Sequence, residues 1–270
     1  MCILFIYTNP SPPQGGYRLV VASNRDEFYK RPAKGAFKCA DTDIIGGRDM
    51  EPGREGGMWL GLSLKPPVIK FATLLNVTGE KKPATLGRGP LVFDYLKTDQ
   101  TAAEYASNLQ GGKYSAFNLV MMEVTKDESC TYHHSNSPQA TYDYVGRQVL
   151  AFGNSTPDAP FTKVTNGKAK FEKIINESTG RDELVDKLVG LLKCEDLHLP
   201  DPELQRRAPG GINFLSSIYV NMKDGGYGTR THSVVLVDDK CNVEFIEHTM
   251  REPIDSMDPK WDVTTIKSQL

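Results

Sequence analysis

The first third of the chain consists of short apolar runs separated by turn residues. Residues 2–7 form a continuous apolar run rich in β-formers, which predicts a buried strand. The Pro- and Gly-rich segment 9–16 is typical of a turn, and the apolar run from Tyr17 to Ser23 completes a predicted hairpin. Further apolar runs at 59–64 and 68–76 continue the pattern. This order predicts antiparallel strands rather than the strand–helix alternation of a Rossmann unit.

The rest of the chain mixes helical and strand patterns. Apolar residues at helical spacing predict helices, and continuous or alternating apolar runs predict strands. The predicted helices cover residues 91–96, 101–109, 161–175 (with an Asn-Gly interruption) and 181–192, and the predicted strands cover 117–124, 130–133, 231–237 and 241–248. No repeat, low-complexity tract or long linker divides the chain. We therefore predict a single α+β domain over 1–270, with two antiparallel sheets and helices outside them.

Composition and charge exclude several classes of function. The 270 residues include 32 Lys and Arg against 34 Asp and Glu, a formal net charge of −2, and this balance argues against a nucleic-acid-binding protein. The longest apolar run, residues 1–7, is far shorter than the roughly 18 residues of a membrane-spanning helix, and it fits neither a signal peptide nor an Arg-rich presequence. The five cysteines are widely spaced without a CxxC pattern, so we expect reduced thiols and a cytoplasmic location.

Cys2 is a candidate nucleophile because of its position. A small residue after Met1 permits removal of the initiator, which leaves a cysteine carrying both a thiol and a free α-amine. Such an amine can act as the base for its own thiol, so nucleophile and base belong to one residue. If Met1 is retained, Cys2 has no free amine. On position alone, a cysteine that simply begins a buried strand is the more frequent case.

Polar side chains follow several predicted strands directly, where binding sites often form. The tetrapeptide 24–27 (Asn-Arg-Asp-Glu) follows the second strand, Asn76 closes a later one, and Asn154 follows another. Arg230 lies in a glycine-containing segment that lets backbone approach closely. An Asn amide can donate to a developing oxyanion, and an Arg can lower the pKa of a nearby thiol or bind a carboxylate. Taken singly, each also fits a loop or capping residue.

The sequence contains no familiar metal or nucleotide motif. We find no P-loop, no G-x-G-x-x-G, no H-E-x-x-H and no G-x-S-x-G. His133 and His134 are adjacent in a predicted strand, so their side chains point to opposite faces and cannot share one ligand. We therefore predict no catalytic metal.

The residues nevertheless match a known family along essentially the whole chain. The matching segments are Met1-Cys2-Ile3, Arg18-Leu19, Ala22–Phe28, Arg31-Pro32, Glu55–Gly61, Gly87-Arg88-Gly89, Phe117-Asn118-Leu119, Leu199–Pro202 and Tyr227–Thr231. Together they resemble the NRDE-motif proteins, the transport and Golgi organization 2 family. Within that family the chain most resembles the nematode members, the haem-responsive-gene group.

The resemblance implies a fold and a set of site residues. The family is similar to N-terminal-nucleophile hydrolases, which form a four-layer αββα sandwich. By that likeness Cys2 is the nucleophile, Asp26 holds its amine, Asn76 and Asn154 line the oxyanion site, and Arg230 lies near the thiol. The hydrolases tend to show Arg-Asn-x-Asp where this chain has Asn-Arg-Asp at 24–26.

The resemblance also implies intracellular haem trafficking, which the family is associated with, alongside the handling of acyl-lipids and acyl-coenzyme A. We therefore expect a haem chaperone that receives haem from protein donors and hands it to acceptors, in the cytoplasm or at mitochondria, Golgi or lysosome-related organelles. The ligand-binding candidates are Asn24, Arg25, Asp26, Glu27 and Arg230, since an Arg suits both propionates and phosphates. The alternatives are a cysteine amidase or thioesterase acting through Cys2, an acyl-coenzyme A or acyl-lipid binding protein, and an interaction protein supporting the Golgi.

Overall fold

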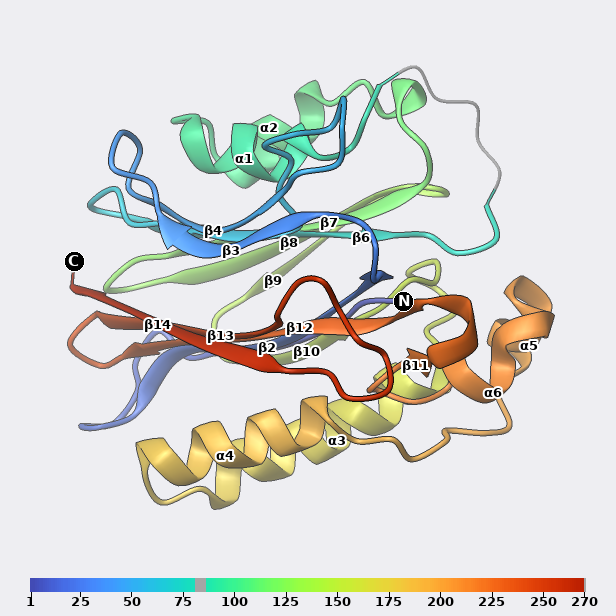
Figure 1. The fold of residues 1–270 in the computed structure, drawn as a ribbon. Helices are drawn as coiled ribbons and strands as arrows, with labels where there is room; N and C mark the ends of the chain where they lie inside the picture. The colour runs from blue at the N-terminus through green and yellow to red at the C-terminus, as the bar shows by residue number, and fades with distance from the viewer. Residues whose placement is uncertain (81–85, 270) are drawn as a thin grey trace.

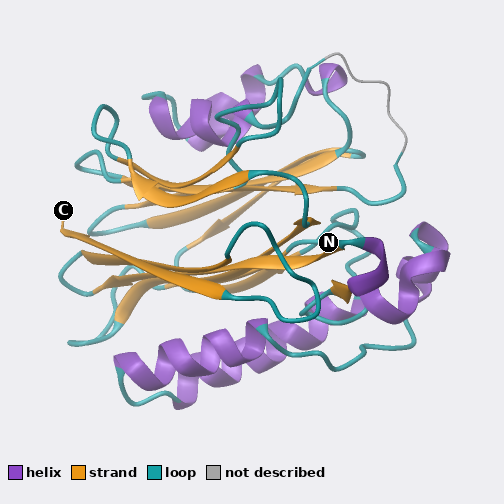
Figure 2. Ribbon diagram, in the orientation of Figure 1, coloured by secondary structure: helices purple, strands orange, loops and turns teal. Residues whose placement is uncertain are grey.

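Two antiparallel sheets stacked face to face form the middle of the molecule (Figures 1 and 2). The computed structural model describes residues 1–80 and 86–269. The first sheet has the order β10-β1-β2-β12-β13-β14, with β11 paired to β12. Its strands are β1 Ile3–Thr8, β2 Tyr17–Phe28, β10 Gln148–Phe152, β11 Asn221–Met222, β12 Tyr227–Asp238, β13 Asn242–Met250 and β14 Trp261–Gln269.

The second sheet follows the chain order from β3 to β9. Such a meander forms when each strand turns back and pairs with the one before it. The longest connection, from β6 to β7, carries the helices that cover this sheet. Its strands are β3 Ala33–Lys38, β4 Ile44–Asp49, β5 Leu60–Ser63, β6 Ile69–Asn76, β7 Phe117–Val124, β8 Ser129–Asn136 and β9 Gln139–Val145.

Helices cover the outer face of each sheet, which gives the predicted order of helix, sheet, sheet and helix (Figure 1). On the second sheet lie α1 Pro90–Lys97 and α2 Ala102–Asn108, and on the first lie α3 Thr162–Glu177 and α4 Arg181–Leu192. The short helices α5 Pro202–Arg207 and α6 Ile212–Leu215 stand at one end of the α3–α4 layer. The prediction of an α+β sandwich of two antiparallel sheets flanked by helices is confirmed.

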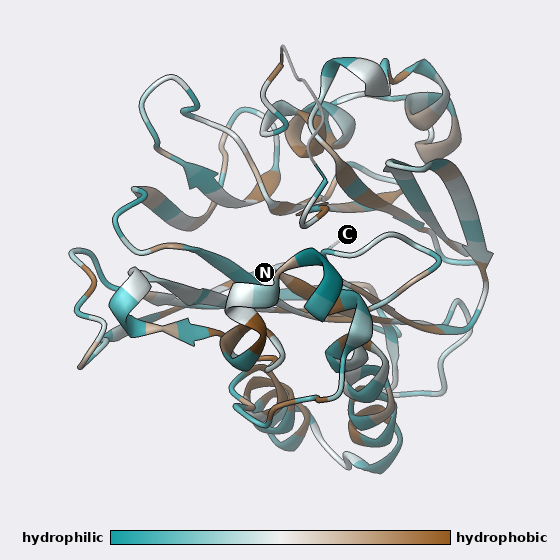
Figure 3. Ribbon diagram, turned by 90° about the vertical axis from the view of Figure 1, so that its right-hand side faces the viewer, coloured by the Kyte–Doolittle hydropathy of each residue, from teal (hydrophilic) through white to brown (hydrophobic). Residues whose placement is uncertain are grey.

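The apolar run at the start of the chain is continuous because both faces of β1 are covered. Ile3 and Phe5 point toward α3 and α4, whereas Leu4 and Ile6 point toward the second sheet. A strand in a half-exposed sheet would alternate apolar and polar residues instead. In Figure 3 the hydrophobic segments accordingly concentrate on the strands and on helix faces turned to them. Among the described residues, no helix is long and apolar enough to cross a membrane.

Strand β2 is longer than its apolar run predicts. We expect it to end at Ser23, with residues 24–27 beyond it, but the strand continues to Phe28. The cause is its neighbour β12, which begins at Tyr227 and extends the hydrogen-bonded ladder alongside. Arg230 likewise lies inside β12, at a register shift between Thr229 and Thr231, and not in a loop.

Helix α3 also departs from prediction, since the Asn166-Gly167 pair does not interrupt it. Gly167 faces the sheet, and a Cβ there would lie 2.5 Å from the ring of Phe5. The glycine therefore allows close packing of the helix on β1 and does not act as a helix breaker.

Candidate functional site

A cavity of about 1180 Å³ opens at one end of the two sheets, and we call it the Cys2 cavity. Cys2 and the segment Arg25–Glu27 line it from the first sheet, and Trp59 and Asn76 line it from the second. Further walls come from the segment 53–58 and from residues 86–90 at the start of α1. Of the residues predicted for the site, the cavity thus brings together Cys2, Arg25, Asp26, Glu27 and Asn76, whereas Asn24, Asn154 and Arg230 are not among its lining residues.

The amine of residue 1 is held at the inner end of this region. It lies 3.0 Å from the Asp26 carboxylate and donates a hydrogen bond of 2.5 Å to the Tyr227 hydroxyl. Thr229 donates to the other Asp26 oxygen at 2.6 Å, because the two residues are opposite one another in the β2–β12 ladder. Asp26 therefore binds the α-amine of Met1. Its expected role of holding the amine of Cys2 stays a prediction.

The Cys2 thiol lies against the backbone of Asp26. The Asp26 amide donates to the sulfur at 3.4 Å, and the sulfur lies 3.8 Å from the Asp26 carbonyl oxygen. Burial raises the pKa of the Cys2 thiol, although the amine at the start of the chain acts in the opposite direction. The thiol is thus mostly protonated at neutral pH and requires a base to react as a nucleophile.

Arg25 places a buried cation on the cavity wall. Its guanidinium lies 4.0 Å from the ring centroid of Trp59, an arrangement that stabilises a desolvated cation. Burial, followed by the charge of Arg230, lowers the pKa of Arg25. Its Nη1 has no hydrogen-bond partner within the described part of the chain. A donor in that state is available to an anion in the cavity.

The two asparagines act as a pair at the end of β6. Asn76 lines the cavity, and the Asn154 side-chain amide donates to the Asn76 carbonyl oxygen at 2.6 Å. The Asn154 side-chain oxygen is buried and finds no partner among residues 1–80 and 86–269. Asn154 thus holds the backbone of Asn76 in place. The expected oxyanion role of the two asparagines stays a prediction.

Asn24 and Arg230 lie outside the lining of the cavity. Asn24 points to the helix side of the first sheet, where it donates to the Leu192 and Ile218 carbonyls. Arg230 donates to backbone carbonyls of the segment 28–31 and pairs with Glu252. Both side chains therefore hold the local backbone in place, and the structure does not bring Arg230 to the thiol. Their ligand-binding role stays a prediction.

Sequence reasoning missed Lys163, a fully buried lysine of α3 beside the N-terminus. Its ammonium donates to the Ser217 carbonyl at 2.9 Å and to the Met1 carbonyl at 3.5 Å. Burial lowers its pKa, although the charges of Asp26 and Cys2 act to raise it. Its spacing in the sequence could have indicated that Lys163 is buried. Lys163, Gly167 and Phe171 follow one another at four-residue intervals and therefore lie on the same buried face of α3. In the part of the chain that the structure describes, no group of three His, Cys, Asp or Glu residues could hold a metal ion.

Comparisons with known proteins agree along the whole chain. The family model described as "Transport and Golgi organisation 2" matches residues 1–252. The "Transport and Golgi organization protein 2" of Drosophila melanogaster is 40% identical over 280 residues, which cover 99% of this chain and 98% of that protein. The Homo sapiens homologue is 34% identical over 93% of this chain and 94% of its own length. The Mus musculus homologue is 32% identical over 100% of this chain and 99% of its own.

Proposed function

The chain belongs to the transport and Golgi organisation 2 family, and from that premise we propose that it is a haem carrier that binds haem in the Cys2 cavity and hands it on. The observation behind this proposal is the combination of a cavity of about 1180 Å³ with a buried, unpartnered Arg25 on its wall. Haem combines a broad apolar face with carboxylates. Trp59 and Phe93 supply aromatic surface in the same cavity, and Arg25 supplies the cation for a propionate.

Handover requires iron ligation that is weak enough to exchange. Among the described residues that line the cavity, the sulfur atoms of Cys2 and Met58 are the only soft ligands for iron. A thiol whose pKa is raised by burial binds iron weakly, because the thiolate is the strong ligand. The carrier would then release haem to an acceptor protein without breaking a strong bond.

The role extends to partners and location. We propose transient protein donors and acceptors of haem, and work in the cytoplasm and at mitochondria, Golgi or lysosome-related organelles. The names of the relatives connect those proteins with transport and Golgi organisation, and we include that connection in the proposal for this chain.

Titration with haem tests the carrier role directly. Wild-type protein should show a saturable Soret shift and transfer haem to an apo-acceptor such as apomyoglobin. Arg25→Gln should weaken haem affinity by about 10-fold or more, the effect of losing a hydrogen bond to a charged group. Arg206→Gln is the matched control, since Arg206 is exposed on α5 and is not part of the cavity. Absence of saturable transfer, or equal losses in both variants, would contradict the proposal.

One observation favours a second candidate, a cysteine amidase or thioesterase for acylated substrates. Cys2, Asp26 and Asn76 line one cavity, and Asp26 already binds an α-amine. After removal of Met1, the amine of Cys2 would accept the thiol proton while sulfur attacks the acyl carbonyl. The leaving amine or thiol would depart with a proton, and water would release the acid from the acyl-enzyme.

The two candidates separate in one pair of measurements. Incubation with acyl-coenzyme A should add the mass of the acyl group at Cys2, or release free coenzyme A, only if the enzyme candidate is right. Cys2→Ala should abolish that reaction and leave haem uptake largely intact, because the protonated thiol ligates iron only weakly and Arg25, Trp59 and Met58 remain in the cavity. Equal loss of both activities would contradict this separation of roles. Intact mass also reports on Met1, because its retention excludes self-activated catalysis at Cys2. If the protein binds neither haem nor acyl-coenzyme A, an interaction protein supporting the Golgi is the remaining candidate.

A further inference from the structure

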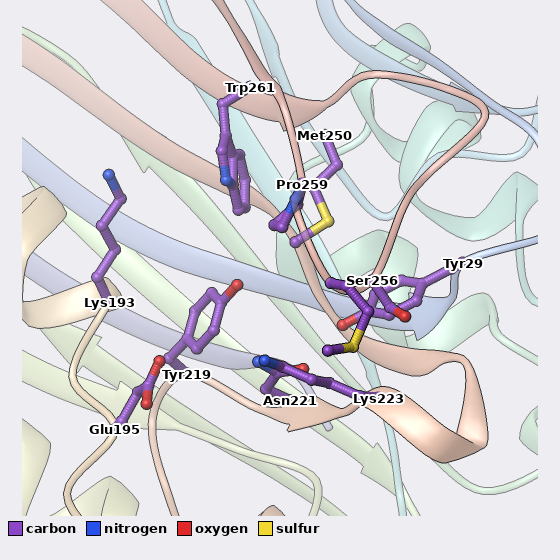
Figure 4. A pocket seen from close by; sticks show the side chains of 11 residues that line it. Tyr29, Lys193, Glu195, Tyr219, Asn221, Lys223, Met250, Ser256, Pro259 and Trp261 are labelled. Carbon is purple, nitrogen blue, oxygen red and sulfur yellow. The ribbon is translucent and has the colours of Figure 1, made fainter.

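A second, smaller cavity lies on the helix side of the first sheet, and we call it the Trp261 cavity. Its volume is about 330 Å³, at the small end of the range for ligand sites. Figure 4 shows Trp261 of β14 at the top and Asn221 of β11 at the bottom, with Tyr219 between them on the left. None of its lining residues belongs to the Cys2 cavity.

The walls of this cavity are aromatic. Trp261 stacks on the buried ring of His232, with centroids 4.7 Å apart and planes 12° from parallel, so one side of the indole is supported by protein. Tyr219 leans on the same imidazole at 5.9 Å. The His232 ring is in turn fixed by Asn24 through a hydrogen bond of 2.6 Å. The cavity thus presents rigid aromatic surface, which favours a flat ring as its occupant.

The polar groups define what that ring must carry. The Asn221 side-chain oxygen is buried and has no hydrogen-bond partner within the described residues, so it calls for an N–H donor. Lys193 and Lys223 line the same cavity and offer two cations to an anionic group. Glu195 also lines the cavity, below Lys193 in Figure 4, and can accept hydrogen bonds from hydroxyl groups.

We propose that the Trp261 cavity binds a nucleoside monophosphate whose base carries an amino group. The base stacks on Trp261 and Tyr219, and its amino group donates to Asn221. The phosphate pairs with Lys193 and Lys223, and the ribose hydroxyls donate to Glu195. An aromatic acid would leave Glu195 facing an anion without a donor, whereas a nucleotide satisfies all of these groups. This site is independent of the proposed haem carrier role.

The first experiment is calorimetric titration of the wild-type protein with AMP and with its two halves. AMP should bind saturably. Ribose 5-phosphate, which lacks the base, should bind about 5-fold or more weakly, the low end of what base stacking contributes, and adenosine, which lacks the phosphate, should also bind more weakly than AMP. The natural ligand could be a free nucleotide or a larger molecule that contains one. Compounds that contain 3′-phosphoadenosine, such as coenzyme A, distinguish the two, because displacement of AMP by coenzyme A would show that the cavity binds the nucleotide part of a larger ligand. No saturable binding, or inorganic phosphate binding as tightly as AMP, would overturn the proposal.

The second experiment locates the site, because the chain has only two tryptophans. In a Trp59→Phe protein, Trp261 is the sole indole, and AMP should quench its fluorescence with the same affinity that calorimetry gives. Asn221→Ala and the double change Lys193→Ala with Lys223→Ala should each weaken AMP binding by about 5-fold or more. The matched control changes Lys97 and Lys240 to Ala, since both are exposed and neither lines the cavity.

Two outcomes distinguish this site from the haem proposal. Arg25→Gln should leave AMP affinity unchanged, and saturating haem should not displace AMP. A protein that fails to bind haem but binds AMP supports the second site alone. Unchanged AMP affinity in both the Asn221 and the double lysine variants would overturn the assignment of this cavity.

Discussion

The carboxylate of Asp26 lies 3.0 Å from the amine of Met1, and the exposed fractions of the two side chains are 0% and 6%. Thr229 and Tyr227 of β12 complete the surroundings of this pair. The start of the chain is thereby fixed to two neighbouring strands, and the position of the adjacent Cys2 thiol follows from it. An ion pair so fully removed from water depends on both partners.

Asp26→Asn should therefore destabilise the protein strongly. It leaves the amine of Met1 buried without its counter-ion, and we expect a loss of about 3–5 kcal/mol in the free energy of unfolding, measured in urea. Asp43→Asn serves as the control, because Asp43 pairs with Lys38 where both side chains are well exposed, and such a pair contributes about 1 kcal/mol or less. Similar losses of unfolding free energy in both variants would show that the buried ion pair stabilises the protein no more than an exposed one.

Glu247 should make stability depend on pH near neutrality. It is buried between the sheets, where the Ala36 amide donates to one of its oxygens and the other has no partner in the described residues. Burial raises its pKa to about 7, against the smaller opposing effects of that hydrogen bond and of Arg25. The folded protein therefore holds a proton that the unfolded chain loses near pH 4.5.

The sign of the effect follows from this raised pKa. The contribution is fully present below pH 4.5 and is lost as pH rises through about 7, a total of about 3 kcal/mol. Glu247→Gln should flatten the decline between those pH values and stabilise the protein above pH 7 relative to wild type. Urea unfolding across the pH range measures it, with the exposed Glu172→Gln as control. An unchanged pH profile in Glu247→Gln would contradict the prediction.

His133 should act in the opposite direction, on the acid side. Its ring packs on Phe152 at 4.8 Å between the sheets and bonds the Asn118 side chain. Burial, followed by the charge of His134, lowers its pKa from 6.5 to about 4. Its contribution is present above pH 6.5 and lost as pH falls through 4, about 3 kcal/mol in all.

His133→Gln keeps a nitrogen that can donate to Asn118 but removes the titrating ring. The variant should lose stability at neutral pH because it leaves a cavity, and its stability should fall less steeply between pH 6.5 and 4 than that of wild type. The slope, followed by thermal unfolding at several pH values, is the diagnostic quantity. A slope equal to that of wild type would assign the acid sensitivity to other groups.

Hydrophobic periodicity predicts the central elements of the fold well. The strand Phe117–Val124 and the helix Arg181–Leu192 are confirmed with the predicted bounds, because each has a covered face that dictates its apolar residues. The sheet edges are different. Strands β9 and β14 expose much of their length, so hydrogen bonding to a neighbour, rather than an apolar pattern, makes them strands.

In the candidate site, too, the sequence predicts the residues that local patterns identify and not the side-chain directions that tertiary contacts decide. Cys2, Asp26 and Asn76 could be named from motif and strand position, and the fold brings all three to one cavity. The side-chain directions of Asn24 and Arg230 could not be predicted, because they depend on the register of β2 against β12 and on its irregularity. A shift of one residue in a strand turns a side chain to the other face.

Gly167 gives the sharpest test of how packing overrides a local signal. An alanine in the interior of a helix is favoured over glycine by about 1 kcal/mol, yet a Cβ at 167 would lie 2.5 Å from the Phe5 ring, which itself stacks on Phe171 at 5.6 Å. Gly167→Ala should therefore destabilise the protein by a net amount of about 1–2 kcal/mol, since overpacking costs more than propensity returns.

Gly190 of α4 is the matched control, because it is exposed and a Cβ there would meet nothing within 4 Å. Gly190→Ala should stabilise the protein by about 0.5–1 kcal/mol, so the same substitution changes sign between two neighbouring helices. Phe5→Leu should relieve the clash, and the Phe5→Leu/Gly167→Ala double variant should be more stable than the sum of the two single effects. Additive effects in that cycle would show that the helix shifts as a whole and that the ring of Phe5 does not set its distance from the sheet.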